Sequence, residues 1–192
     1  MDITWLPDAT PRPRRLAVGE FDGVHVGHRE VIAGADSVLT FEPHPRTVVS
    51  PASAPKLLTT LEQKADLIAA LGVDELIVIP FDGARMSQTA QEFIDHELVG
   101  HLRATHVSVG ENFRFGHRAR GDADLLRAQT AFETRVCELV EVEGEDARFA
   151  AHGRAIPGTA EGVVRLRDRD GLIALAEPRG DGTLKPIVGF RG

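Results

Sequence analysis

Residues 19–28 read Gly-Glu-Phe-Asp-Gly-Val-His-Val-Gly-His, and this stretch decides how the chain folds and where its chemistry lies. The apolar run Leu16-Ala17-Val18 leads into it, which predicts a strand that turns into a helix. Glycine lets a ligand approach the backbone N–H groups, and a helix N-terminus favours negative charge. His25 and His28 are three residues apart and so share one face of the first helical turn. The stretch therefore predicts a polyphosphate site.

Two other interpretations of this stretch compete with phosphate binding. A glycine-rich turn between a strand and a helix occurs in many α/β proteins and is weak by itself. The two histidines are also spaced like metal ligands, with His44 as a third candidate. No nearby cysteine or Glu-x-x-His pattern completes a metal site, so the whole His-x-Gly-His element favours phosphate.

Apolar strand-like runs alternate with helix-like segments along most of the chain. The strands expected are Arg15–Val18, Ser37–Phe41, Glu75–Pro80, Thr105–Val109 and Arg135–Val142. The helices expected begin with capping signals at Thr60, Thr89 and Asp122. This alternation predicts an α/β fold, a Rossmann-like doubly wound parallel sheet.

Polar segments follow the carboxyl ends of the predicted strands, where ligands of such sheets bind. Besides residues 19–28 they are Thr40–Pro45, Pro80–Asp82 and Gly110–Gly116. Four segments that converge on one edge are hard to explain by packing alone.

The pattern changes beyond Gly144, where glycine-rich turns separate short apolar runs. These runs are Gly162–Leu166, Leu172–Ala176 and Pro186–Phe190, which predict two or three antiparallel strands. We expect a main α/β domain over residues 1–150 and a small β-rich C-terminal appendage over residues 151–192. So small a piece should pack on the main domain.

Bulk properties narrow the class of protein. The chain has 192 residues and a formal net charge of −7, which argues against a nucleic-acid partner. Its one cysteine, Cys137, lies in an apolar run and is expected to be buried in the protein. A single cysteine cannot form an internal disulfide, which fits a reducing cytoplasm. No run approaches the ~20 apolar residues of a membrane helix, and no secretory leader is recognisable. We expect a cytoplasmic protein with small-molecule substrates and no membrane partner; no pattern indicates an oligomeric state.

Three motifs in order carry a resemblance to a known family. They are Gly-x-Phe-Asp-Gly-Val-His-x-Gly-His from Gly19, Thr-Phe-Glu-Pro-His-Pro from Thr40, and Val-Gly-Glu-Asn-Phe-Arg-Phe-Gly from Val109. From about Leu16 to Val142 the chain resembles the prokaryotic FAD synthetases. The likeness is to their N-terminal FMN adenylyltransferase module, part of the His-x-Gly-His nucleotidyltransferase superfamily.

The resemblance implies transfer of AMP from ATP to FMN, giving FAD and pyrophosphate, with Mg²⁺ neutralising part of the triphosphate charge. It implies that the catalytic residues His25 and His28 contact the ATP phosphates. The residues implied for nucleotide binding are Gly19, Phe21, Asp22, Gly23 and Gly27. Those implied for flavin binding are Phe41, Pro43, His44, Asn112, Phe113 and Arg114. No residue is implied as a metal ligand.

The chain also departs from the family pattern. The second nucleotide motif, Ser-Ser-Thr-x-x-Arg, is expected near residues 145–155, but no Ser-Ser-Thr occurs in the sequence. The segment between His28 and Ser37 is too short for the family's long first helix. The riboflavin kinase motif Pro-Thr-Ala-Asn is absent, so kinase activity is not expected. Beside a working FMN adenylyltransferase, two hypotheses stay open: a catalytically impaired flavin or adenine-nucleotide binding protein, and a transferase with another acceptor.

Overall fold

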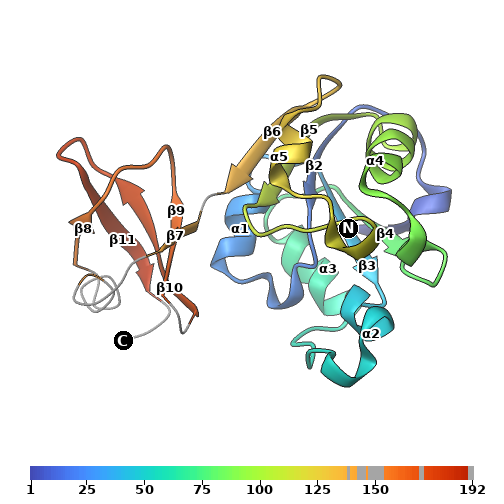
Figure 1. The fold of residues 1–192 in the computed structure, drawn as a ribbon, viewed down its shortest axis with the longest axis horizontal. Coiled ribbons are helices and arrows are strands. Elements are labelled where there is room, and N and C mark those ends of the chain that lie inside the picture. The colour runs from blue at the N-terminus through green and yellow to red at the C-terminus, as the bar shows by residue number, and fades with distance from the viewer. Residues whose placement is uncertain (138, 142–145, 147–153, 169–170, 190–192) are drawn as a thin grey trace. The chain divides into compact units, whose positions relative to one another are not determined.

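The computed structural model describes residues 1–137, 139–141, 146, 154–168 and 171–189 (Figure 1). Contacts divide the chain into two compact units, Met1–Val136 and Cys137–Gly192. This division comes earlier than the domain boundary expected between residues 150 and 151. That expected boundary lies outside the described residues, as do residues 147–153 around it.

A six-stranded sheet forms the centre of the first unit. Its strands are β1 (Asp2–Trp5), β2 (Arg14–Val18), β3 (Ser37–Glu42), β4 (Glu75–Pro80), β5 (Ala104–Gly110) and β6 (Glu133–Cys137). They lie in the order β1-β4-β3-β2-β5-β6, and the pairs β1–β4, β4–β3, β3–β2 and β2–β5 are parallel. The chain moves outward from β2 through β3 and β4 and then returns to add β5 on the other side. This reversal confirms the doubly wound sheet and places its switch point between β2 and β5.

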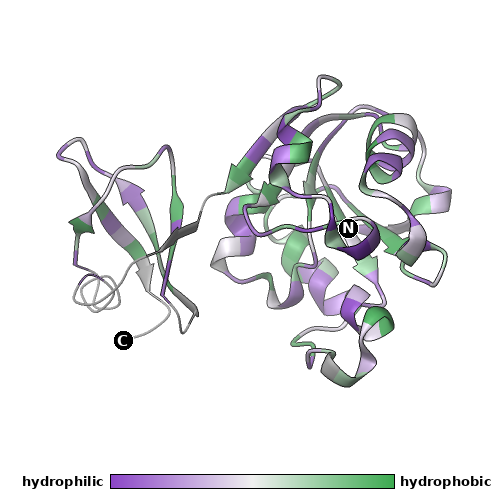
Figure 2. Cartoon of the chain, in the orientation of Figure 1, coloured by the Kyte–Doolittle hydropathy of each residue, from purple (hydrophilic) through white to green (hydrophobic). Residues whose placement is uncertain are grey.

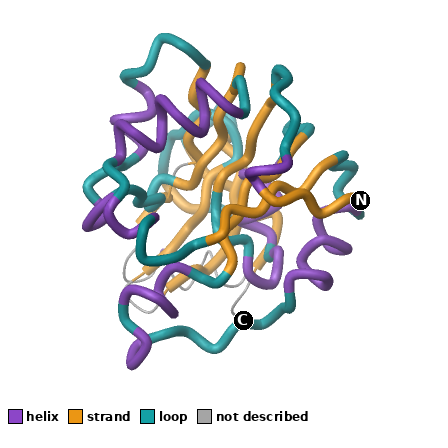
Figure 3. Tube along the Cα trace, turned by 90° about the vertical axis from the view of Figure 1, so that its right-hand side faces the viewer, coloured by secondary structure: helices purple, strands orange, loops and turns teal. Residues whose placement is uncertain are grey.

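Helices lie on both sides of this sheet (Figures 1 and 3). They are α1 (Val26–Ile32), α2 (Pro45–Val49), α3 (Leu61–Ala69), α4 (Ala90–Glu92) with the π-helix η5 (Phe93–His101), and α5 (Ala123–Arg127). Short 3-10 turns are η1 (Leu6–Asp8), η2 (Asp22–Val24), η3 (Pro51–Ser53), η4 (Arg85–Ser87) and η6 (His117–Ala119). Hydropathy alternates along these helices, which is typical of elements that bury one face (Figure 2). No helix among the described residues is long and apolar enough to cross a membrane.

The predicted helix starts are confirmed by their caps. Thr60 and Thr89 each form a capping box, with Gln63 and Glu92 respectively. The Asp122 side chain accepts a hydrogen bond from the Leu125 backbone N–H at 2.9 Å. Each side chain satisfies a backbone donor that the helix itself leaves unpaired, which is why these residue types begin helices.

A buried ion pair joins strands at the amino end of the sheet. Arg14 is fully buried, and its Nε donates to Glu75 Oε2 at 2.9 Å while its Nη2 donates to the Thr10 carbonyl at 2.9 Å. Burial raises the pKa of Glu75, but hydrogen bonds and charge from Arg14, with Arg12 and Ser37, outweigh it and hold that pKa below its usual value. The ion pair thus lies at the amino end of the sheet, whereas the loops with the predicted site residues follow the carboxyl ends of the strands.

The second unit contains a separate five-stranded sheet. Its strands are β7 (Leu139–Glu141), β8 (Ile156–Pro157), β9 (Val164–Asp168), β10 (Gly171–Pro178) and β11 (Thr183–Gly189), in the order β7-β9-β10-β11-β8. The pairs formed by β9, β10, β11 and β8 are antiparallel, whereas β7 lies parallel to β9. Its buried apolar cluster includes Ile156, Leu166 and Leu184. The C-terminal β appendage is thus confirmed, with more strands than the two or three predicted.

Two further differences from the predicted elements have physical causes. The run expected as one strand over Arg135–Val142 forms β6 and β7, which belong to different sheets; Val142 lies outside the described residues. An apolar run indicates extended backbone but not which sheet receives it. The edge strand β1 was not predicted because most of its side chains are exposed and carry no burial pattern. Cys137 is buried, as expected.

Candidate active site

The loop after β2 folds into a tight turn at the switch point of the sheet. Phe21 and Val24 both have positive φ, at 51° and 39°, and both side chains are buried. Positive φ is uncommon for non-glycine residues, and a β-branched residue such as valine rarely adopts it. The surrounding contacts therefore hold the loop in a conformation that it would not adopt alone.

Two glycines in this loop are closely surrounded by side chains. A Cβ on Gly19 would lie 3.1 Å from the ring of Phe21. Gly23 has φ +70°, and a Cβ there would lie 3.0 Å from Leu58 Cδ1. Packing is thus one reason for glycine at these positions. The reason predicted from the sequence is the close approach of a phosphate to the backbone. Nucleotide binding by Gly19, Gly23 and Gly27 stays a prediction.

The predicted pair of histidines lies together at the start of α1. Their rings stack with centroids 3.5 Å apart and an interplanar angle of 22°. His25 caps the helix through the backbone N–H of His28. This N–H donates to His25 Nδ1 at 3.3 Å and to the His25 carbonyl at 2.8 Å. A neutral His25 that accepts at Nδ1 carries its proton on Nε2. Because His25 is exposed, that Nε2–H can donate to an anion.

Asp22 ties this loop to the segment before α3. Its carboxylate accepts from the Leu58 N–H at 2.9 Å, the Thr59 N–H at 3.0 Å and the Thr59 hydroxyl at 2.9 Å. Burial raises the pKa of Asp22, but these hydrogen bonds outweigh it and the pKa is lowered. Gly23 N–H in turn donates to Thr59 Oγ1 at 3.2 Å. In the structure Asp22 is an anchor, and its predicted nucleotide contact stays a prediction.

A buried lysine supports the same loop and was missed in the sequence analysis. Lys64 on α3 is 6% exposed, and its Nζ donates to Thr40 Oγ1 at 3.4 Å. Thr40 donates onward to the Glu20 carbonyl at 3.2 Å, so α3 and β3 together hold the backbone of Glu20. Burial lowers the pKa of Lys64, against the charges of the acidic residues around it. The available signal was a lysine on the helix face that also carries Ala65 and Ile68.

Glu20, within the loop, was likewise not singled out. Its Oε2 is buried, has no hydrogen-bond partner among the described residues, and lies 3.9 Å from His44 Nε2. Burial raises the pKa of Glu20 to about 8, opposed by the charge of Lys64. A raised pKa favours the uncharged form of Glu20, and this form puts no negative charge beside a loop predicted to bind phosphates.

The segment after β3 places its predicted flavin residues in three environments. Phe41 is 8% exposed and packs in the core against Phe81 and Phe93, with ring centroids 6.1 and 6.4 Å away. Pro43, after a cis Glu42–Pro43 bond, is exposed. His44 caps α2 by accepting from the Arg46 N–H at 3.1 Å. Burial lowers the pKa of His44, and the positive charge of Lys64 lowers it further. Of these residues Pro43 is the most accessible to a ligand.

The loop after β5 presents polar side chains to solvent. Phe113 and Phe115 stack with centroids 5.4 Å apart, and Phe115 is buried in the core. Asn112 is exposed, and Arg114 is 54% exposed with Nη1 3.6 Å from Asp122 Oδ2. The aromatic residues fix the loop while Asn112 and Arg114 project from it. The segment 145–155, expected to hold the second nucleotide motif, lies outside the described residues apart from Asp146 and residues 154–155.

A sequence model described as FAD synthetase matches residues 8–150, about three-quarters of the chain. The chain belongs to the FAD synthetase family. The match takes in both the loop with the stacked histidines and the loop with Asn112. It also confirms the resemblance stated from the motifs.

Curated relatives agree with this assignment. The chain is 39% identical over 122 residues to the bifunctional riboflavin kinase/FMN adenylyltransferase of Escherichia coli K12, covering 58% of this chain and 39% of the relative. It is 35% identical to the protein of that name from Pseudomonas fluorescens, covering 66% of this chain and 45% of the relative. The chain thus matches less than half of the length of these relatives.

One solved structure has the same fold at low sequence identity. It is described as a macrolide-efflux protein from Streptococcus pneumoniae, with a TM-score of 0.63 and 17% identity. The match covers 99% of this chain and 84% of that one. At this identity the likeness concerns the fold alone.

Proposed function

We propose that this FAD synthetase family member is an FMN adenylyltransferase, which moves AMP from ATP to FMN and releases pyrophosphate. The observation that carries the proposal is the stacked His25–His28 pair, held at the switch point of a sheet whose next loop presents Asn112 and Arg114. A polyphosphate site beside an open polar loop suits a reaction between two phosphate-bearing substrates.

The chemistry needs no general base, because the phosphate of FMN is already an anionic nucleophile. An oxygen of that phosphate attacks the α-phosphorus of ATP and forms the new P–O–P link of FAD. The bond from the α-phosphorus to the bridging oxygen breaks, and its electrons leave with pyrophosphate. The protein supplies alignment and stabilises the charge that grows on the leaving group.

In this mechanism the imidazole N–H groups of His25 and His28 donate to the phosphates of ATP. Asp22 and Lys64 act as positioning residues, because they hold the loop through Thr59 and Thr40. The flavin side is formed by Asn112 and Arg114, with Pro43, His44, Phe41 and Phe113 around them. Mg²⁺ enters with ATP as part of that substrate and neutralises part of the triphosphate charge.

The proposal also covers the extent of the domain, the partners and the location of the protein. The nucleotidyltransferase domain extends over residues 1–150, which is supported by the end of the family match at residue 150. The formal charge of −7 supports small-molecule partners over nucleic acid. A cytoplasmic location is consistent with the ATP and FMN that the reaction uses.

The test is to incubate the pure chain with FMN, ATP and Mg²⁺ and to separate the products for FAD. We expect FAD over many turnovers with one pyrophosphate for each FAD. An ATP analogue with a methylene group between the α- and β-phosphorus is the matched control and should give none. Bound FMN or ATP without FAD would support a binding protein instead. Pyrophosphate release only with an acceptor other than FMN would support a different transferase.

A further inference from the structure

The face of β2, β5 and β6 beside the end of α1 is polar. Arg15 pairs in register with His106, and Ala17 pairs with Ser108. His106 and Ser108 are two residues apart on β5 and therefore point to the same side of the sheet. The helix α1 has only seven residues and ends at Ile32. The sheet beyond that point carries charged and hydroxyl side chains, as suits a face in contact with water or a polar ligand.

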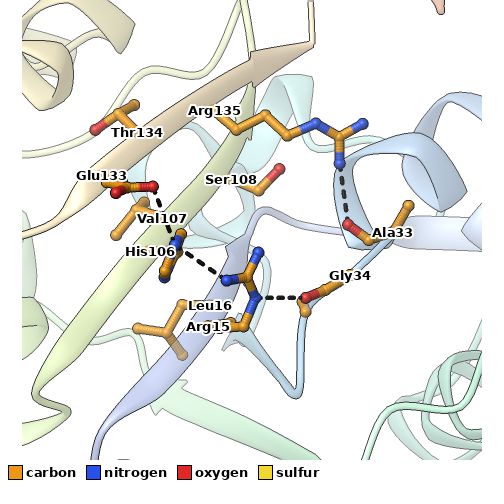
Figure 4. A pocket seen from close by; sticks show the side chains of 11 residues that line it. Arg15, Leu16, Ala33, Gly34, His106, Val107, Ser108, Glu133, Thr134 and Arg135 are labelled. Atoms are coloured by element: carbon orange, nitrogen blue, oxygen red, sulfur yellow. Dashed lines mark hydrogen bonds and ion pairs between the residues drawn. The ribbon is translucent and has the colours of Figure 1, made fainter. Parts of the chain in front are cut away.

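A hollow of about 240 Å³ lies over this face (Figure 4). Arg15 Nε donates to the Gly34 carbonyl at 2.9 Å, and Arg135 Nη1 donates to the Ala33 carbonyl at 3.0 Å. Both guanidinium groups are thus held by carbonyls of the turn after α1. A carbonyl fixes the position of a guanidinium without neutralising its charge. Arg15 Nη1 also lies 3.0 Å from His106 Nε2 (Figure 4).

Three acidic groups lie near these two arginines. Glu30 Oε2 lies 3.9 Å from Arg135 Nη2, at the limit of an ion pair. Glu133, whose side chain is 83% exposed, lies 3.1 Å from His106 Nε2. Asp36 accepts from the backbone N–H of Arg15 at 3.1 Å. Of these three acidic residues only Glu133 lines the hollow, together with Arg15 and Arg135, so two arginines face one carboxylate there.

Ser108 provides a second and independent observation. The residue is 8% exposed, and its buried Oγ has no hydrogen-bond partner within the described part of the chain. A buried hydroxyl is normally paired, because an unpaired one loses its hydrogen bonds to water without replacement. Figure 4 shows this hydroxyl among the residues that line the hollow, on the same side as Arg135.

We propose that this hollow binds a phosphate group, with Arg15, Arg135 and Ser108 as its donors. Guanidinium groups offer paired N–H donors that match the oxygens of phosphate, and a hydroxyl adds a third direction. The site lies toward the amino ends of β2 and β5, whereas the histidine pair follows their carboxyl ends. It is therefore separate from the proposed active site. Free inorganic phosphate and the phosphate of a nucleotide monophosphate both have this chemistry.

The test follows the imidazole C–H resonance of His106, which lines the hollow, by NMR of the full chain. His106→Gln assigns the signal. Titration with sodium phosphate should move it saturably, beyond any shift in sodium chloride of equal ionic strength. Arg15→Gln with Arg135→Gln should weaken binding at least roughly tenfold. The control Arg127→Gln removes an exposed arginine on α5 that pairs with Asp124, and should change nothing.

Two further arms keep the outcome clear if the double variant folds poorly. Ser108→Ala should lower phosphate affinity several-fold while leaving the free protein equally or more stable, because it removes an unpaired buried hydroxyl. His28→Ala should leave the His106 titration unchanged, which separates this hollow from the histidine pair. Binding of AMP tighter than phosphate would identify a phosphate ester as the ligand, and the reverse a free anion. No saturable shift, or an undiminished one in the arginine and Ser108 variants, would overturn the proposal.

Discussion

The loops after β2 and β5 stand side by side in the sheet order but are built differently. The β2 loop turns its polar groups inward: Asp22 binds the Leu58–Thr59 backbone, and Lys64 reaches Glu20 through Thr40. The β5 loop turns aromatic residues inward and leaves Asn112 and Arg114 exposed. A loop held from several sides can be organised before a charged substrate arrives, which matters most where charge develops in the transition state. An exposed loop contributes chiefly to binding.

The largest effect should follow from removing an imidazole of the preorganised loop. We expect His28→Ala to lower the rate of FAD formation by ~10²–10³-fold, as for loss of one preorganised donor. The measurement is kcat/KM for ATP by product separation, with circular dichroism to check the fold. His96→Ala removes an exposed histidine on η5 as the control. Unchanged activity in His28→Ala would remove the phosphate role from this histidine.

A smaller effect should follow from loosening the same loop without touching its histidines. Asp22→Ala removes three hydrogen bonds to a carboxylate, which we expect to cost about 2 kcal/mol of folding free energy and to lower kcat/KM for ATP ~10-fold or more. Chemical denaturation and steady-state kinetics measure the two effects. Asp124→Ala, on an 84% exposed side chain, is the matched control. If Asp22→Ala weakened FMN binding more than ATP binding, the two sides of the site would have to be exchanged.

The β5 loop should respond through binding of the acceptor. Asn112→Ala should weaken FMN binding about tenfold, equivalent to one good hydrogen bond, and leave ATP binding within about twofold. Flavin fluorescence titration measures the first and calorimetry with ATP the second. Arg120→Ala, an exposed residue further along the chain, should alter neither. A larger loss for ATP than for FMN would contradict the division of roles between the loops.

A last effect should be on the pH dependence of stability. Because the pKa of Glu20 is raised from 4.5 to about 8, the folded protein keeps this proton in a range where the unfolded chain has lost it. This contribution to stability is complete below pH 4.5 and declines as pH rises to about 8. Glu20→Gln should therefore make the unfolding free energy fall less steeply with pH, as measured from about pH 5.5 to about pH 8. The control Asp124→Asn should show the same slope as the parent protein. Equal slopes in Glu20→Gln and the parent would show that Glu20 is already ionised.

Much of the first unit could be predicted because its signals are local. The apolar run Leu76–Ile79 is buried on both faces as expected of a central parallel strand. Thr60 and Thr89 began helices because capping depends only on residues within the same turn. The edge strand β1 could not be found this way, since only its pairing with β4 makes it a strand. For the same reason the division of Arg135–Val142 between two sheets was invisible.

The sequence by itself determined the succession of the central strands and helices, the paired histidines and the family, because these depend on neighbours along the chain. Only the tertiary structure decided that Asp22 is an anchor, that Lys64 is buried beneath the loop and that burial raises the pKa of Glu20. Each of these properties arises between segments far apart in sequence, where burial and the distance to another charge set the pKa and the hydrogen bonds. The hollow beside α1 belongs to the same class. It exists because three strands and a short helix meet there, and no local pattern records that meeting.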